Sequence, residues 1–216
     1  MSDQGKRYDS EEVVVRYNIK RCIHFAACVR GLPSVFDEQR RPWIEPGNAD
    51  ADAVAEVVQR CPTGALHFER LDGGTAEQPQ PHASVQVSEN GPLYVRGELT
   101  LQREDGAQIV KDTRIALCRC GMSGNKPFCD NSHKQGFQDA GELSPKDKTT
   151  EATDEPLTIT VSNVGPYKLA GSFTIRSADG SDTRTYARAS LCRCGTSKHK
   201  PFCDGSHNQL DPEIFT

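Results

Sequence analysis

Two short stretches of this chain each carry four residues that bind soft metals. Each stretch has the pattern Cys-x-Cys, then eight residues, Cys, three residues and His. The two sets are Cys118, Cys120, Cys129 and His133, and Cys192, Cys194, Cys203 and His207. Thiolates and imidazole select zinc or an iron-sulfur cluster over hard cations. Zinc loops usually space their paired cysteines more widely than Cys-x-Cys, so a structural zinc site is the alternative to a cluster.

Each metal loop ends a longer repeat. At an offset of 74 residues, Val87-Ser88 matches Val161-Ser162 and Gly91-Pro92 matches Gly165-Pro166. In both copies two runs of alternating apolar and polar residues precede an Asp-Gly turn, and a third run leads to the first cysteine. Each copy is therefore predicted to consist mostly of strands followed by a metal loop.

Three further cysteines, Cys22, Cys28 and Cys61, lie in an N-terminal segment of different pattern. "EVVVRYN" predicts a strand and "ALHFERL" a returning strand. "DADAVAEVVQRCP" predicts a helix with Asp50 or Asp52 as its N-cap and Pro62 as its stop. On that helix Val54, Val57, Val58 and Cys61 share one face. We expect this segment to be α+β.

Composition separates the segments. Gly, Pro and small polar residues dominate 71–84, and 139–156 has no apolar periodicity, so both stretches predict linkers. The predicted domains are 1–73, 84–138 and 156–216. The expected fold class is α+β, with an N-terminal α+β domain followed by two β-rich repeats.

Charge and hydropathy restrict the cellular setting. The 216 residues carry a formal net charge of -4, which lacks the basic footprint of a nucleic-acid binder. The first residues have no apolar signal segment, and no apolar run approaches the ~18 residues of a membrane helix. Nine cysteines, an odd number, favour metal binding in a reducing compartment over disulfides. We therefore expect a soluble, cytoplasmic protein that binds neither nucleic acid nor membrane.

Both metal loops resemble the signature of the CDGSH iron-sulfur family. Ser123 and Ser197, Pro127 and Pro201, and "CDNSH" and "CDGSH" fall where that pattern expects them. The resemblance implies one 2Fe-2S cluster in each loop and decides against zinc. It implies that one iron is bound by Cys118 and Cys120 and the other by Cys129 and His133, with Cys192 and Cys194, and Cys203 and His207, as the equivalent pairs.

The resemblance also implies an assembly and a redox range. Members of the family are typically homodimers, so two copies in one chain imply a monomeric, pseudo-two-fold unit, with a homodimer as the other possibility. The first copy has Asn131 where the family has Gly; if this position takes a positive φ, Asn tolerates it best. A histidine in place of a fourth cysteine leaves the cluster less negative, which raises its potential above that of plant-type ferredoxins. The imidazole can also couple reduction or cluster release to protonation.

Charged and aromatic residues accompany these ligands in both loops. The four cations either offset cluster charge or are solvated surface charges. They are Arg119, Arg193, Lys126 and Lys200. Phe128 and Phe202 are expected to shield the cluster from water.

"RCIHFAAC" and "CPTGAL" resemble single-cluster ferredoxin domains that lack one ligand, with Phe25 where the second cysteine would stand. The resemblance implies a 3Fe-4S cluster on Cys22, Cys28 and Cys61, or an atypical 4Fe-4S cluster completed by His24 or an exogenous ligand. Three buried structural cysteines are the alternative. Trp43 is expected in the core.

These features favour a one-electron carrier that exchanges electrons with a redox partner, a reductase or an oxidase. A cluster-transfer protein that serves an apo-acceptor, or a redox or pH sensor, is the second hypothesis, and a structural zinc protein the third. The sequence shows no nucleophile and base pair, phosphate loop or dinucleotide fingerprint, so we expect no enzyme activity.

Overall fold

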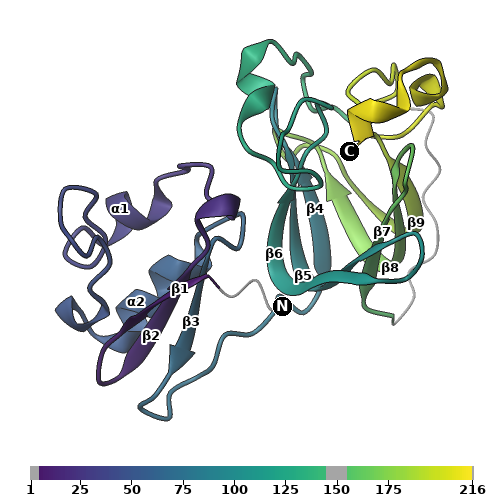
Figure 1. Cartoon of the computed structure of the whole chain (residues 1–216). Coiled ribbons are helices and arrows are strands. Elements are labelled where there is room, and N and C mark those ends of the chain that lie inside the picture. Colours follow the sequence, from purple (N-terminus) through teal and green to yellow (C-terminus); the bar gives the residue numbers. More distant parts are fainter. Residues whose placement is uncertain (1–4, 145–154, 216) are drawn as a thin grey trace. The chain divides into compact units, whose positions relative to one another are not determined.

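The computed structural model describes residues 5–144 and 155–215. The chain is mostly β with few helices, and it divides into two compact units, 1–78 and 79–216 (Figure 1). Within the described residues both α-helices belong to the first unit. In this part of the chain no helix combines the length and the apolar character that crossing a bilayer requires.

The first unit is an antiparallel sheet with a helix packed on it (Figure 1). The strand order is β1 (Lys6–Asp9), β2 (Val13–Tyr17), β3 (Leu66–Arg70). The predicted helix is α2 (Ala51–Gln59), and Asp50 caps it by accepting a hydrogen bond from the Ala53 N–H at 2.8 Å. Val54, Val57 and Val58 are buried on its inner face, as their spacing predicted. Two predicted strands and the predicted helix are thus confirmed.

One strand, one α-helix and two 3-10 turns of this unit were not predicted. Strand β1 has one buried side chain, Tyr8, and therefore no visible alternation. Helix α1 (Ala27–Gly31) is a single short turn without a side-chain cap. Two 3-10 turns, η1 (Ile19–Arg21) and η2 (Pro46–Asn48), complete the unit. Trp43 packs against the core with its ring centroid 4.8 Å from that of Tyr17, as expected.

The second unit contains both repeats. The first copy forms β4 (Ala83–Val87), β5 (Leu93–Arg103) and β6 (Gln108–Leu117). The second forms β7 (Leu157–Val161), β8 (Tyr167–Arg176) and β9 (Thr183–Leu191). Within each copy neighbouring strands pair in antiparallel fashion. The predicted strands are therefore confirmed in both copies.

The two repeats also pair with each other. Strand β4 runs parallel to β8, with Ala83 opposite Phe173, and β5 runs parallel to β7, with Leu99 opposite Leu157. The two pairings are equivalent to each other, because at the 74-residue offset Ala83 corresponds to Leu157 and Leu99 to Phe173. All six strands form one sheet around one hydrophobic core, which contains residues of both repeats. Each repeat therefore completes the sheet of the other.

The predicted linker 139–156 is packed at its beginning. Asp139 pairs with the buried Arg119, its Oδ1 2.5 Å from Nη1, and Leu143 is buried in the shared core. The linker prediction was wrong for residues 139–144. The prediction rested on the polar composition of the segment, and composition does not show that one acid pairs with a buried arginine or that one leucine enters the core. Residues 145–154 of that prediction, and the predicted domain ends at 1–4 and 216, lie outside the described residues.

Candidate metal centres

The end of a long strand positions two donors of each loop, its first and third cysteines. Strand β6 ends at Leu117, which forms a β-bridge with Phe128. The Cys118 N–H donates to the Pro127 carbonyl at 2.9 Å, and the Cys129 N–H donates to the Ala116 carbonyl at 2.9 Å. The second loop repeats this bridge between Leu191 and Phe202. Cysteines eleven residues apart in the sequence thus become neighbours across a bridge.

The other motif residues fold the loop. Ser123 Oγ donates to the Phe128 carbonyl at 2.7 Å, and the carboxylate of Asp130 accepts the N–H groups of Gly124 at 2.8 Å and Ser132 at 3.0 Å. Ser197 and Asp204 make the equivalent bonds in the second loop. These side chains therefore hold the loop backbone rather than the metal.

A left-handed residue turns each loop toward its histidine. Asn131 has φ 77° and Gly205 has φ 85°. The conditional prediction for Asn131 is met: the position takes a positive φ, and Asn tolerates it. The next residues form η3 (Ser132–Gln135) and η4 (Ser206–Gln209), which carry the two histidines.

The eight predicted donors lie in four close pairs. Cys118 Sγ is 3.5 Å from Cys120 Sγ, and Cys129 Sγ is 3.3 Å from His133 Nδ1. The second loop has the same pairs, Cys192 with Cys194 at 3.8 Å between the sulfurs and Cys203 with His207 Nδ1 at 3.3 Å. Such distances suit two donors on one tetrahedral iron.

Donors of a mononuclear zinc site would all converge on one point. Across 5–144 and 155–215, no three His, Cys, Asp or Glu side chains do so. Each loop presents its donors as two pairs, one pair for each metal of a two-metal centre. A pocket at the first loop brings together Cys118, Cys120, Cys129 and His133. The residues present therefore fit a two-iron cluster.

The thiols have strongly shifted proton affinities. An S–H···S hydrogen bond from Cys120 lowers the pKa of Cys118 to about 6, and one from Cys192 lowers the pKa of Cys194 to about 5. The partner thiols, Cys120 and Cys192, have raised pKa values for the same reason. Burial raises the pKa of Cys129 to about 11. Metal binding by these pairs must therefore release protons.

The two metal loops touch each other. A Cβ atom on Gly121 would lie 2.5 Å from the Cys194 carbonyl oxygen, and one on Gly195 would lie 2.5 Å from the Cys120 carbonyl oxygen. Both glycines have a positive φ. Only a residue without a side chain fits this contact, so the ligand cysteines of the two loops lie close together. Both loops are at the same end of the sheet (Figure 1).

The arginines of the loops are buried, so their interpretation as solvated surface charges was wrong. Arg119 is 1% exposed and Arg193 is 3% exposed. Arg119 donates to the carbonyls of Ser88 and Gly91 and pairs with Asp139. The Arg193 guanidinium lies over the Phe215 ring, 4.6 Å from its centroid. Both charges are fixed beside the thiols.

The other loop residues lie as follows. Lys126 and Lys200 are half-buried, and Lys200 Nζ donates to the Ser197 carbonyl at 2.6 Å. Phe128 and Phe202 pack against the shared core of the repeats. Their first role is therefore to pack the loop onto the sheet.

Two contact residues were missed by sequence reasoning. The hydroxyl of buried Tyr167 donates to the carbonyls of Cys118 at 2.8 Å and Pro127 at 3.0 Å, so the second repeat holds the loop of the first. Thr196 Oγ1 lies 3.2 Å from Cys194 Sγ. A signal existed for both, since the first copy has Leu93 and Met122 at these positions. A comparison of the two copies, position by position, would therefore have identified both residues.

The N-terminal thiols are half-buried and close enough to interact. Burial raises the pKa of Cys28 to about 11, and the charges of Cys61 and Cys22 add to that rise. Burial, with a hydrogen bond to Cys22, raises the pKa of Tyr17. Cys61 follows α2, whose C-cap is Arg60. Three thiols from two distant segments thus face one region.

The residues between Cys22 and Cys28 form an open loop. His24 and Ala26 have φ 53° and φ 64°, so the chain turns sharply around this segment. His24 is exposed, and Phe25 is 47% exposed. Phe25 therefore does not fill the core in place of the cysteine expected there.

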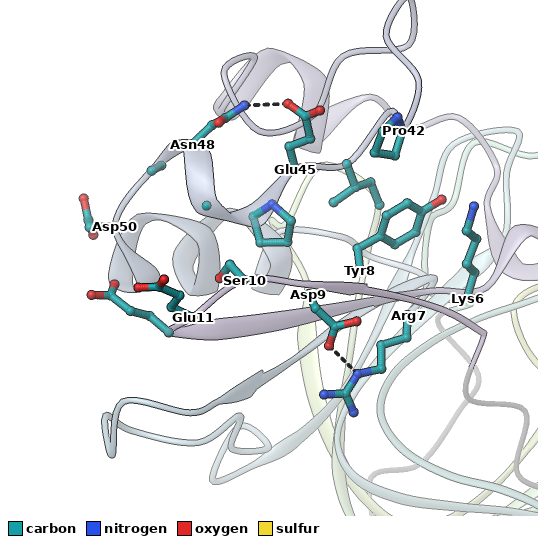
Figure 2. A pocket seen from close by; sticks show the side chains of 15 residues that line it. Lys6, Arg7, Tyr8, Asp9, Ser10, Glu11, Pro42, Glu45, Asn48 and Asp50 are labelled. Atoms are coloured by element: carbon teal, nitrogen blue, oxygen red, sulfur yellow. Dashed lines mark hydrogen bonds and ion pairs between the residues drawn. The ribbon is translucent and has the colours of Figure 1, made fainter.

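The first unit also has an open groove of about 1000 Å³ between β1 and residues 42–50 (Figure 2). Its polar side chains bond to one another: Arg7 to Asp9, and Asn48 to Glu45 at 2.8 Å. Of the residues that the structure describes, those lining this groove include neither Cys nor His. The groove is separate from the predicted donors.

Comparison with protein families divides the chain in the same places. A family described as "Divergent 4Fe-4S mono-cluster" matches residues 8–70. A family described as "Iron-binding zinc finger CDGSH type" matches residues 90–134 and 164–208. The two resemblances inferred from the sequence are confirmed. The N-terminal family is a 4Fe-4S family, so it does not support the 3Fe-4S form.

Among curated proteins, the chain is similar to the uncharacterized protein YjdI of Escherichia coli K12. The two are 40% identical over 67 residues, which cover 31% of this chain and 88% of that protein. The YjdI protein of Escherichia coli O157:H7 matches with the same identity and coverage. No solved structure matches the chain.

Proposed function

Because the chain belongs to the divergent 4Fe-4S mono-cluster family over 8–70 and to the CDGSH iron-binding family over 90–134 and 164–208, we propose that it is a one-electron carrier. The observation that supports this most is the arrangement of donors in two Cys/Cys pairs and two Cys/His pairs at 3.3–3.8 Å. We assign one 2Fe-2S cluster to each loop, with each pair on one iron. A bound cluster accepts and releases one electron while its framework stays intact.

The residues of the loops favour reduction. A neutral imidazole at His133 and His207 leaves each site with one negative charge fewer than four thiolates would. The buried side chain of Arg193 places a cation beside the thiols. The Met122 N–H donates to Cys120 Sγ at 3.4 Å, which further disperses charge. We therefore expect potentials above those of plant-type ferredoxins.

We assign one further cluster to Cys22, Cys28 and Cys61. The family match favours 4Fe-4S. Three thiolates then leave one iron for an exogenous ligand or for the exposed His24, and loss of that iron would give 3Fe-4S.

We propose that the tandem repeats form a monomeric pseudo-two-fold unit that serves a reductase or oxidase partner and does no substrate chemistry itself. The reciprocal pairing of β4 with β8 and β5 with β7 supports the monomer, because each repeat makes the same contact with the other within one chain. None of the nine cysteines forms a disulfide bond in the structure, which supports a reducing compartment such as the cytoplasm.

Cluster transfer is the second candidate. His133 and His207 are half-buried and lie on single 3-10 turns, so these ligands are more accessible than the buried Cys118 and Cys192. Dissociation of one histidine from its iron would begin release of the cluster to an apo-acceptor. Incubation with an apo-ferredoxin, followed by absorbance of the separated proteins, distinguishes transfer from electron exchange.

The deciding test is EPR of anaerobically purified protein before and after dithionite, with iron, zinc and acid-labile sulfide assays. We expect iron and sulfide, and rhombic 2Fe-2S signals after reduction. A near-isotropic signal in the oxidised sample would assign 3Fe-4S to the N-terminal unit. Its absence, with surplus iron, would assign 4Fe-4S. Stoichiometric zinc without sulfide would contradict the carrier proposal.

A further inference from the structure

The two repeats share their ligand types but differ in the charges around them. Arg119 and Arg193 occupy equivalent positions, each between the two cysteines of Cys-x-Cys. Both are buried. A buried charge acts through a medium of low dielectric, so it affects a nearby redox centre more than an exposed charge does. The effect of each arginine on the nearby ligand set therefore depends on whether an acid neutralises its charge.

In the first loop the arginine is neutralised by an acid. Arg119 Nη1 lies 2.5 Å from Asp139 Oδ1, and Asp139 is itself mostly buried. The Arg119 Nε–H donates to the Gly91 carbonyl at 2.7 Å. The Arg119–Asp139 pair brings no net charge to the first ligand set.

In the second loop the arginine pairs with no carboxylate of the residues that the structure describes. Arg193 Nη2 is 3.4 Å from the carbonyl oxygens of Asn163 and Phe215, and its Nε–H has no hydrogen-bond acceptor among the described residues. Its guanidinium packs against the Phe215 ring. In this part of the chain Arg193 contacts two carbonyl oxygens and two aromatic rings, and none of these contacts is an ion pair. Within 5–144 and 155–215, the second ligand set therefore lies beside a positive charge that no carboxylate neutralises.

An independent difference acts in the same direction. Thr196 Oγ1 is 3.2 Å from Cys194 Sγ, so its hydroxyl can donate to the thiolate. The equivalent residue of the first loop is Met122, which has no side-chain donor. Hydrogen bonds to ligand sulfur stabilise the reduced state of a cluster.

The remaining differences are smaller. Each loop has an exposed lysine that the other lacks, Lys134 in the first and Lys198 in the second, and salt screens exposed charges over about 8–10 Å. Arg193 also lies 5.8 Å from the ring centroid of Tyr167, which contacts Cys118, so part of its field reaches the first set. Its guanidinium also packs on Phe215, which shares a buried cluster with Cys192 and Cys194, so its charge acts on the second set as well.

We propose that the two ligand sets, once loaded as in the proposed function on which this inference rests, have unequal reduction potentials and that the second set receives the first electron. In that step an external one-electron donor reduces one ferric ion to ferrous, and no bond forms or breaks. We expect the second set to hold at least ten times more of the first electron, which corresponds to about 59 mV for a one-electron couple.

The test is a dithionite titration of the full chain, followed by EPR and visible circular dichroism. Cys129→Ala leaves only the second set complete, and Cys203→Ala leaves only the first. We expect the higher midpoint in Cys129→Ala. Equal or reversed midpoints, with iron and sulfide present in both variants, would overturn this inference and leave the carrier proposal intact. Absence of iron and sulfide from the wild-type chain would overturn both.

Three further variants retain every ligand, so they test the proposal even if the two ligand-deletion variants misfold. Asp139→Asn should raise the lower midpoint, since it leaves Arg119 uncompensated. Thr196→Met should lower the upper midpoint, and Met122→Thr should raise the lower one. Asp72→Asn is the matched control, because it removes the same charge from an ion pair with Arg70 in the other unit. Midpoints that move no more in these three variants than in the control would refute the proposed cause.

Discussion

Replacing Gly121 by alanine tests the contact between the two metal loops. The new Cβ would lie 2.5 Å from the Cys194 carbonyl oxygen and 3.3 Å from its Cα. An ordinary contact begins at 3.4 Å, so the loops must separate by about 0.9 Å at that oxygen. The atoms that the new Cβ meets belong to the backbone of Cys194, which cannot rotate away as a side chain would.

Two costs combine in this variant. A non-glycine residue at φ 81° costs about 1–2 kcal/mol. Overpacking against a fixed backbone costs about 1–3 kcal/mol more. Gly121→Ala should therefore lower the free energy of unfolding by about 2–5 kcal/mol and shorten the lifetime of the bound clusters.

Gly106→Ala provides the matched control. Gly106 has φ 84°, but nothing lies within 4 Å of the position of its Cβ, so this variant has only the conformational cost. Urea unfolding followed by circular dichroism gives the free energies, and decay of visible absorbance gives the cluster lifetimes. Equal effects of the two substitutions would refute the close contact of the loops.

Three further substitutions test separate parts of the structure. Asn131→Gly should stabilise the chain by up to about 1 kcal/mol in thermal unfolding, because glycine adopts φ 77° without strain, and Gly205→Asn should cost a similar amount. A loss of stability in Asn131→Gly, or a gain in Gly205→Asn, would contradict the equivalence of the loops. Asp50→Ala should cost about 1 kcal/mol in urea unfolding through the lost cap of α2, whereas exposed Asp52→Ala should cost less; equal losses would argue against the cap. Cys61→Ser should remove the iron of the N-terminal cluster alone, as measured by iron assay and EPR, and loss of the 2Fe-2S signals as well would show that the two units are coupled.

Local pattern was enough to predict most elements of this fold. Alternation identified the strands of the repeats because one face of each is buried, as in β5, where Leu93, Val95, Leu99 and Leu101 point inward. The motif spacing also grouped the cysteines and histidines that the structure brings into pairs. The backbone demand at Asn131 followed from its alignment with a glycine.

Long-range relations could not be predicted in this way. The pairing of Ala83 with Phe173 depends on which strand edges stay unpaired after the strands of each repeat have paired. A local sequence pattern does not show which edges these are. The burial of Arg119 depends on Asp139, which lies in a stretch of linker-like composition. A charged residue in a sequence carries no sign of whether a distant acid will allow it to be buried.

The reciprocal pairing of the repeats has a consequence for synthesis on the ribosome. Until β8 has left the exit tunnel, β4 has only β5 as a neighbour, and the edge of β5 that later receives β7 is open. At 5–20 residues per second, roughly 4–15 s separate the end of β5 from the end of β8. During that delay two nascent chains on one messenger can exchange strands, so a slow codon run between the repeats would favour an entangled dimer over the monomer.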